Sequence, residues 1–464
     1  MAALTAHDLH DLVADGATEF GVPGVAVGLW HQGQISYACH GTTSIEHPLP
    51  VDRHTLFQAG SIGKTFTAAA LVLLEAEGNV VLDAPVRRYV PELKLADASA
   101  AAEVTLRQLL NHTAGWDGDF FPDTGEGDDA LTRLVARLHE LHQLTPPGAV
   151  VSYNNAALCL AGRVIEKVTG ETYEGAIRRL LLAPLDLRES FFFRDDIMTR
   201  RFAVGHTSAA DGALRVARPW GLPRSGAPAG GLVTSIVDLL AWARAHLEDD
   251  GVRGRPGLGK SSLGVMREPS VRAPGWAFGD AVGIGWILSD LGGAWLCGHD
   301  GSTHGQEASL ALLPEEDWAL AIMTNASPAG LGFNRALRTR VLAACTGWIA
   351  TQPQTQVATP ETLAAYAGTY GARGMRCEVA AGAGGALVFS VYEGTELLEL
   401  MSDPVALRSS AATTLHADLL RDHADRFVFI GEPVQGIPGY FARARGGAVQ
   451  AVQLFGRWLP RLHG

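Results

Sequence analysis

The sequence predicts an α+β fold: one antiparallel sheet built from both ends of a region, a helical insertion between them, and a smaller all-β region behind it. Strand-like runs occur near the N-terminus and return between residues 282 and 324. Residues from about 80 to 275 are mostly helix-like or loop-like, and short alternating runs fill residues 361–464. Strands on both sides of a helical middle are typical of an α+β arrangement.

The N-terminal part predicts a helix, a hairpin and a second helix in that order. Thr5 followed by Asp8 is a capping-box pattern, which predicts the start of a helix. Two apolar runs joined by a short polar turn predict a β-hairpin over Gly24–Trp30 and Ile35–Cys39. Residues 60–78 then carry apolar side chains at helical spacing and end at a glycine, which predicts the second helix.

Four later runs predict the strands that complete the sheet: Val282–Leu288, Ala294–Cys297, Ala308–Leu313 and Trp318–Thr324. Before them, Ser235 and Asp238 form another capping box, which predicts the helix Ile236–Leu247. After them, an apolar stretch predicts a long helix over Gly332–Ala350. The segment from about 80 to 275 is therefore expected as a helical insertion into the sheet.

A change in sequence character divides the chain into two expected domains. Residues 351–360, TQPQTQVATP, are polar and contain prolines, which predicts a linker. Beyond them, glycine-rich turns separate alternating runs that predict a small antiparallel sheet or barrel: Ala386–Tyr392, Arg426–Ile430, Gly439–Arg443 and Val449–Phe455. We expect one domain over residues 1–350 and a β domain over residues 361–464.

Composition and charge argue against several classes of protein. The net charge of −12 argues against a nucleic-acid partner, which would require a basic surface. Five cysteines without a CxxC pair predict buried reduced thiols, not a disulfide framework or a zinc site. The N-terminus has no basic and apolar leader, and the chain has no apolar run of about 18 residues. We therefore expect a cytoplasmic protein that does not contact a membrane.

The strongest chemical signal is Ser61-Ile62-Gly63-Lys64, at the start of a predicted helix. Helix positions i and i+3 share a face, so the Lys64 amine can reach the Ser61 hydroxyl. The helix N-terminus and burial both lower the pKa of the lysine, and a neutral amine can take the serine proton. Arginine cannot do this, and only four of the 37 Lys and Arg residues are lysines. A phosphate-binding loop is the alternative, but it requires a glycine where the chain has Gln58.

Two further motifs carry residues that suit this chemistry. In Tyr153-Asn154-Asn155, a phenol near a cationic amine can ionise or relay a proton, and an asparagine amide can hold a substrate carbonyl or the lysine. Asn155 also fits the cap of a helix over Ala156–Val168. His299-Asp300-Gly301 follows a predicted strand, at the place where an edge of the sheet would flank the nucleophile helix.

Taken in order, Ser61-x-x-Lys64, Tyr153-x-Asn155 and His299-x-Gly301 resemble the three motifs of the serine β-lactamases and penicillin-binding proteins. The pattern is most similar to the branch of class C β-lactamases and D-Ala-D-Ala carboxypeptidases or esterases. The stretches LNHTAG at 110–115 and PAGGL at 228–232 are also similar, and the resemblance covers roughly residues 5–350. The C-terminal part resembles the lipocalin-like domain that is appended to some members.

The resemblance implies an acyl-enzyme mechanism without a metal or a cofactor. It implies that the catalytic side chains are the nucleophile Ser61, the proton-transfer groups Lys64 and Tyr153, the orienting Asn155, and His299 on the opposite wall. The oxyanion hole would consist of the backbone N–H groups of Ser61 and Ser302. The substrate would contact Gly230, Gly301 and, from the appended domain, the basic residue Arg457.

The third motif departs from the Lys-Thr-Gly of many β-lactamases. A histidine can be neutral at pH 7 and Asp300 adds a negative charge, so the case for a β-lactamase is weaker. Our leading hypothesis is a stand-alone penicillin-binding-protein-type thioesterase that releases and macrocyclises a nonribosomal peptide. Its partner would be an acyl or peptidyl ester, thioester or amide, presented on a carrier protein. The alternatives are a cytosolic esterase or D-amino-acid amidase, a β-lactamase or D,D-carboxypeptidase, and a catalytically silent binding protein.

Overall fold

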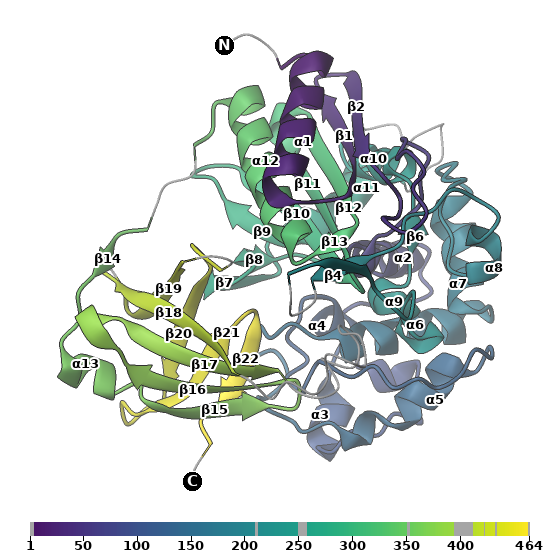
Figure 1. Cartoon of the computed structure of the whole chain (residues 1–464). Coiled ribbons are helices and arrows are strands. Elements are labelled where there is room, and N and C mark those ends of the chain that lie inside the picture. Colours follow the sequence, from purple (N-terminus) through teal and green to yellow (C-terminus); the bar gives the residue numbers. More distant parts are fainter. Residues whose placement is uncertain are drawn as a thin grey trace.

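The computed structural model describes residues 4–208, 212–248, 258–349, 353–393, 412–421, 423–431 and 434–462. A large sheet and its helices lie beside a helical region, and a nearly closed antiparallel barrel follows at the C-terminal end (Figure 1). The predicted α+β fold with an added β region is confirmed. The division of the chain at residues 351–360 stays a prediction.

The large sheet takes its strands from both parts of the sequence, as predicted. Its order over the described residues is β2-β1-β12-β11-β10-β9-β8-β7, and all neighbours are antiparallel. The N-terminal strand β1 lies next to β12, with Val25 opposite Thr324. The strands are β1 (Gly24–His31), β2 (Gln34–Gly41), β7 (Val271–Trp276), β8 (Gly279–Val282), β9 (Ile287–Asp290), β10 (Trp295–Thr303), β11 (Gln306–Leu313) and β12 (Trp318–Thr324).

Helices cover both faces of this sheet. On one face α1 (Ala6–Phe20) and α12 (Ala329–Thr346) lie side by side, and their apolar side chains share one core (Figure 1). The predicted capping box at Thr5 and Asp8 starts α1. On the other face, α10 (Ile236–Ala245) reaches β1 because Gly28 has no side chain in the way; a Cβ there would be 3.2 Å from Leu240.

The helical region surrounds α2 (Gly63–Ala76), which follows the 3₁₀ turn η1 (Gly60–Ile62) and is buried along most of its length. Its neighbours include α6 (Asn155–Thr169) and α9 (Ala227–Gly230). The other helices are α3 (Ala98–Glu103), α4 (Leu106–Leu110), α5 (Ala130–Ala136), α7 (Tyr173–Ile177), α8 (Arg194–Ile197) and α11 (Lys260–Leu263). The predicted insertion also contains the short strands β4 (His206–Ser208), β5 (Leu214–Val216) and β6 (Val233–Thr234), and β7 of the large sheet begins inside it, so it is not purely helical. Outside it, β13 (Ala326–Ser327) lies beside β4, and β3 (Phe57–Gln58) lies beside β6.

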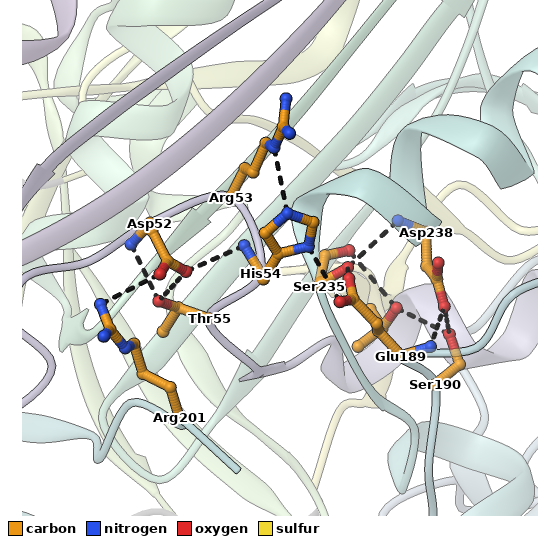
Figure 2. Close-up of polar contacts among 10 residues, drawn as sticks. Asp52, Arg53, His54, Thr55, Glu189, Ser190, Arg201, Ser235 and Asp238 are labelled. Atoms are coloured by element: carbon orange, nitrogen blue, oxygen red, sulfur yellow. Dashed lines mark hydrogen bonds and ion pairs between the residues drawn. The ribbon is translucent and has the colours of Figure 1, made fainter.

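A polar cluster anchors the chain that leads into β3 and then into η1, which we call the nucleophile turn because it contains the expected nucleophile Ser61 (Figure 2). The Asp52 carboxylate accepts from the hydroxyl of Thr55, 3.0 Å away. His54 then contacts Glu189 at 2.9 Å, and Glu189 accepts a hydrogen bond of 2.6 Å from Ser235, the N-cap of α10. The cluster therefore ties the segment before β3 to the start of α10.

The C-terminal region forms a sheet that curls toward closure. Its strands run in sequence order from β15 to β22, and a bridge between Tyr370 and Arg461 connects the two ends. Phe389, Phe427 and Phe441 are among the side chains that fill its interior. The elements are β14 (Thr355–Gln356), α13 (Pro360–Ala364), β15 (Gly368–Ala372), β16 (Met375–Ala381), β17 (Leu387–Glu393), β18 (Thr413–Leu420), β19 (His423–Ile430), β20 (Pro438–Arg443), β21 (Val449–Leu454) and β22 (Arg457–Pro460).

Three expectations about individual elements need correction. The run Val282–Leu288 is not one strand, because the chain turns between β8 and β9 at Gly285, whose φ of +73° suits glycine. The long helix α12 starts at Ala329 and stops before Gly347, a left-handed cap. The expected linker contains β14, while its residues 351 and 352 lie outside the described residues.

The burial of the cysteines differs in part from the expectation. Cys39 and Cys345 are half-buried, whereas the other free cysteines are buried as expected.

Candidate active site

The nucleophile turn places Ser61 and Lys64 on one face. Ser61 lies in η1 and Lys64 in the first turn of α2, and the lysine Nζ donates to Ser61 Oγ at 2.9 Å. The same Nζ also donates to the backbone carbonyl of Ala229 at 2.6 Å, on α9. The amine is therefore held by two acceptors, one in η1 and one on α9.

Burial sets the charge of Lys64. The side chain is fully buried, and this desolvation lowers the pKa of its amine to about 7. Arg457 also lowers this pKa, while Cys159 and Asp119 raise it. At neutral pH a large fraction of the amine is unprotonated, so it can accept the proton of Ser61.

Tyr153 lies beside this pair, just before α6. Its phenol interacts with the Ser61 side chain, and the Lys64 Nζ lies 4.9 Å from the centre of its ring. Burial raises the pKa of the phenol well above its usual value, more than the interaction with Ser61 lowers it. The tyrosine therefore stays protonated at neutral pH, which suits a proton relay and not a standing phenolate.

Asn155 is directed at a buried carboxylate, not at Lys64. Its side-chain amide donates to Asp119 at 2.9 Å. Asn154, and not Asn155 as expected, caps α6 by accepting from the N–H of Ala157 at 2.8 Å. Asp119 is the residue that sequence reasoning missed, because it belongs to no recognised motif and lies 36 positions before Asn155.

Arg457 comes from the barrel and reaches the same carboxylate. Its Nε and Nη2 donate to the two Asp119 oxygens at 3.0 and 3.2 Å, and its guanidinium lies 5.1 Å from the centre of the Tyr153 ring. The turn before β22 also provides the carbonyl of Gly456, which accepts from the backbone N–H of Tyr153 at 2.8 Å. The structure therefore brings the barrel directly to the Tyr-x-Asn motif.

His299 lies on β10, inside the strand and not after it. Its ring centre is 6.1 Å from that of Tyr153, and burial, together with the nearby Lys64, lowers its pKa to about 4. Nδ1 donates to the carbonyl of Asp300 at 2.7 Å, so the buried Nε2 is the unprotonated nitrogen of a neutral ring. The carboxylate of Asp300 pairs with Arg338 of α12 at 2.7 Å, although its charge still raises the pKa of His299 and of Tyr153.

Two stretches of backbone meet at the expected oxyanion hole. A Cβ on Gly301 would lie 2.0 Å from the carbonyl of Ala59 and 3.0 Å from the N of Ser61. A Cβ on Gly60 would lie 2.9 Å from the N of Ser302. Only glycines permit this approach, which brings the backbone N–H groups of Ser61 and Ser302 close to one another.

Gly230 also packs against the nucleophile turn. A Cβ there would be 3.2 Å from the backbone of Gly60, and the preceding residue provides the carbonyl that binds Lys64. Gly230 lines a cavity of about 400 Å³ with Phe192, Phe193 and Trp220 among its walls. The predicted site residues thus lie on or near the nucleophile turn, and Gly230 lies between this turn and the cavity.

Two further side chains were not assigned a role from sequence. His112, in the LNHTAG stretch, stacks on Tyr153 with ring centres 4.4 Å apart, and its Nδ1 accepts from the N–H of Asn154. Phe278, in the turn between β7 and β8, packs edge-on against Tyr153 and is 39% exposed. The stretch around His112 carried a signal, whereas nothing in the sequence marked Phe278.

A model of the family described as Beta-lactamase matches residues 9–344. The chain therefore belongs to the β-lactamase family and is a hydrolase of the serine β-lactamase and penicillin-binding-protein type. The matched residues include Ser61, Lys64 and Tyr153.

Individual relatives are similar over different lengths. The chain is 34% identical over 332 residues to penicillin-binding protein 4 of Amycolatopsis lactamdurans, which covers 69% of this chain and 85% of that protein. It is 30% identical over 304 residues to esterase EstB of Burkholderia gladioli, covering 56% and 74%. The crystal structure of SurE with D-Leu matches with a TM-score of 0.77 and 28% identity, covering 98% of this chain and 99% of that one.

The described part of the chain has neither a cluster of metal ligands nor a membrane-spanning helix. Over those residues, no group of three His, Cys, Asp or Glu side chains is arranged to hold a metal ion. No helix among them has the length and apolar character needed to cross a membrane.

Proposed function

We propose that the protein is a serine acyl-enzyme that releases a peptide from a thioester and closes it into a ring. The observation that carries this proposal is the contact of a barrel arginine with the acylation machinery: Arg457 pairs with Asp119 and lies over Tyr153. A guanidinium here suits recognition of a polar backbone group or carboxylate of a peptidyl donor. The proposed donor is carried on a carrier protein and met in the cytoplasm.

In the proposed acylation, neutral Lys64 takes the proton of Ser61 while Oγ attacks the carbonyl carbon. The N–H groups of Ser61 and Ser302 donate hydrogen bonds to the carbonyl oxygen and stabilise the negative charge that develops on it. When the carbon–sulfur bond breaks, the thiolate leaves with the proton that Lys64 holds, relayed through Tyr153. In the second half-reaction, the peptide's own amine attacks the carbonyl carbon of the acyl-enzyme ester. The bond from this carbon to Ser61 Oγ breaks, and the amine proton passes through the same relay to Oγ.

The D-configuration of the donor's last residue is part of the proposal. The solved structure of SurE, which matches 98% of this chain, was determined with D-Leu. That match includes the barrel, unlike the family model, which ends at residue 344. A D-residue next to the scissile thioester is therefore the substrate feature to vary first.

The test uses linear peptidyl thioesters with a free N-terminal amine and a C-terminal D- or L-residue. We expect an acyl adduct on the intact protein, absent from Ser61→Ala, and a product that has lost only the thiol. If every peptide instead gives the linear acid, which is heavier than the cyclic product by one water, the cyclase is rejected. Absence of any Ser61-dependent adduct, also with a serine-directed phosphonate, would reject the acyl-enzyme and favour a silent binding protein.

A simple esterase is the second candidate, and the similarity to esterase EstB supports it. The two functions differ in how much of the substrate they use. An esterase would turn over short acyl esters with a kcat/KM at least as high as that of peptidyl thioesters. For a cyclase, kcat/KM would be higher for the peptidyl thioester, and Arg457→Ala would lower it more for that substrate than for the ester.

A further inference from the structure

A buried carboxyl group supports the strand that forms one side of the expected oxyanion hole. Glu307 of β11 is 5% exposed and lies directly opposite Ser302 of β10 in the sheet. The Ser302 hydroxyl donates to Glu307 Oε1 at 2.9 Å, and the hydroxyl of Ser327 donates to the same oxygen at 2.5 Å. None of these three side chains takes part in the mechanism above.

The carboxyl lies on the face of the sheet that α12 covers, away from the nucleophile. A Cβ on Gly330, in the first turn of α12, would lie 3.1 Å from the Cβ of Glu307. The hydroxyl of Thr324 on β12 donates to the Glu307 carbonyl at 3.0 Å. Asp300 on β10 faces the carboxyl but is paired with Arg338 of α12. The side chain is thus bound by hydroxyls from β10 and β13, while β12 bonds to its backbone and α12 packs close beside it.

We propose that Glu307 is a positioning residue that fixes the oxyanion hole by holding the side chain of Ser302. The proposal rests on the proposed acyl-enzyme function. Ser302 lies near the end of β10, two residues before the hairpin turn at His304 and Gly305, where a strand has least support of its own. Its backbone N lies against Gly60, so a rotation of Ser302 would turn the N–H away from the carbonyl oxygen.

The protonation state of Glu307 suits this task. Burial raises the pKa of the carboxyl to about 8, more than the bonds from Ser327 and Ser302 lower it, and Asp300 raises it further. At neutral pH the group is mainly a carboxylic acid, whose Oε1 is a carbonyl acceptor for the two hydroxyls. A glutamine has the same carbonyl in the same place, and its amide replaces the acid O–H.

The test compares four variants of the full chain on a small activated ester: Glu307→Ala, Glu307→Gln, Ser302→Ala and their double variant Glu307→Ala/Ser302→Ala. We expect Glu307→Ala to lower kcat about tenfold or more with KM changed less than about twofold, because complete loss of an oxyanion donor costs about 10²–10³. Glu307→Gln should restore most of kcat. Ser302→Ala should reproduce most of the loss, and the double variant should add little to it.

A boronic acid provides a readout that a general loss of stability would not change. It forms a tetrahedral adduct with the serine whose oxygen occupies the oxyanion hole, so Glu307→Ala should raise its inhibition constant about as much as kcat falls. Ser309→Ala is the matched control, because Ser309 lies on β11 on the same face but contacts Arg338 instead. It should leave both quantities unchanged.

Three outcomes would overturn the proposal. One is an unchanged kcat in Glu307→Ala that still acylates at Ser61. Another is an equal loss in Glu307→Gln and Glu307→Ala, which would mean that the hydrogen bond to Oε1 is not the cause. The last is additive losses in the double variant. A wild-type protein that forms no Ser61 adduct would instead reject the proposed function itself, so the two failures are distinguishable.

Discussion

Complete burial of a lysine lowers the pKa of its amine, because the charged form loses its hydration. Lys64 is such a residue, and both of its hydrogen-bond acceptors, the Ser61 hydroxyl and the Ala229 carbonyl, are uncharged. Among the residues that the structure describes, no carboxylate forms an ion pair with this amine, and Asp119 raises its pKa less than burial lowers it, which is why the pKa falls to about 7. The rarity of lysine in this chain, four against 33 arginines, therefore gives this position a chemical meaning.

Lys64→Arg tests whether the neutral form is needed. A guanidinium stays charged in a protein, so it cannot take the serine proton, and we expect the acylation rate to fall about 10³-fold or more. Lys167→Arg is the matched control, since Lys167 forms a surface ion pair with Glu92 that arginine can also form. Burst kinetics with p-nitrophenyl acetate measure both. An active Lys64→Arg protein would contradict the role of Lys64 as the base.

The pKa of Lys64 also predicts how acylation depends on pH. Below about 7 the amine binds a proton and the base is lost, so the acylation rate should fall about tenfold per pH unit. His299, with a pKa of about 4, stays neutral over this range, and Tyr153 keeps its proton. Below pH 7 Glu307 also keeps its proton, so stopped-flow acylation between pH 5 and 7 should follow the ionisation of Lys64 alone. A flat profile would show that Lys64 is not the group that loses the proton.

At the scale of elements, the site depends on how closely β10 approaches η1. Gly301 and Gly60 leave no side chain between the two backbones, and each would place a Cβ within about 3 Å of the other segment. The sheet therefore does more than carry His299, because it sets the separation of the two proposed oxyanion donors, the N–H groups of Ser61 and Ser302.

Gly301→Ala tests this contact. The added methyl would meet the carbonyl of Ala59 at 2.0 Å, which forces β10 away from η1 and separates the N–H groups of Ser61 and Ser302. We expect kcat to fall about 10²-fold, as for loss of one oxyanion donor. Gly446→Ala is the control, since a Cβ there meets nothing within 4 Å. Kinetics alongside circular dichroism would decide; wild-type kcat in a folded Gly301→Ala protein would contradict the geometry.

At the scale of the whole molecule, the sequence revealed the parts of the site that depend on local spacing. Ser61 and Lys64 are one helical turn apart, and most of the large sheet could be predicted because those strands are continuous apolar runs. Strand β7 was missed, because Val271–Trp276 lies in the stretch expected to be helical or loop-like and is interrupted by Arg272, Pro274 and Gly275. Asp119 and Glu307 could not be found this way. Their roles depend on contacts with Arg457 and Ser327, 338 and 20 positions away, and a lone acidic residue has no periodicity that predicts burial.

The barrel is the part of the molecule whose contribution sequence alone could least define. Its turn before β22 supplies the Gly456 carbonyl, which accepts from both the N–H of Tyr153 and the indole of Trp276. Arg457 neutralises Asp119, which is 4% exposed and would otherwise be a buried unpaired charge. These contacts predict that the barrel supports the catalytic residues as well as the substrate.

Two changes separate these roles. A chain ending at residue 352 loses the acceptor for Tyr153 and the partner of Asp119 together, so we expect at least about tenfold slower turnover of p-nitrophenyl acetate and of a peptidyl thioester.

In the full chain, Arg457→Ala with Asp119→Asn removes the guanidinium without leaving an unpaired carboxylate. That variant should keep small-ester turnover within about threefold while peptidyl thioester turnover falls about tenfold or more, the value of a charge-assisted hydrogen bond. Steady-state kinetics on both substrates measure the split, and a truncated chain with wild-type ester turnover would show that the barrel contacts do not support Tyr153.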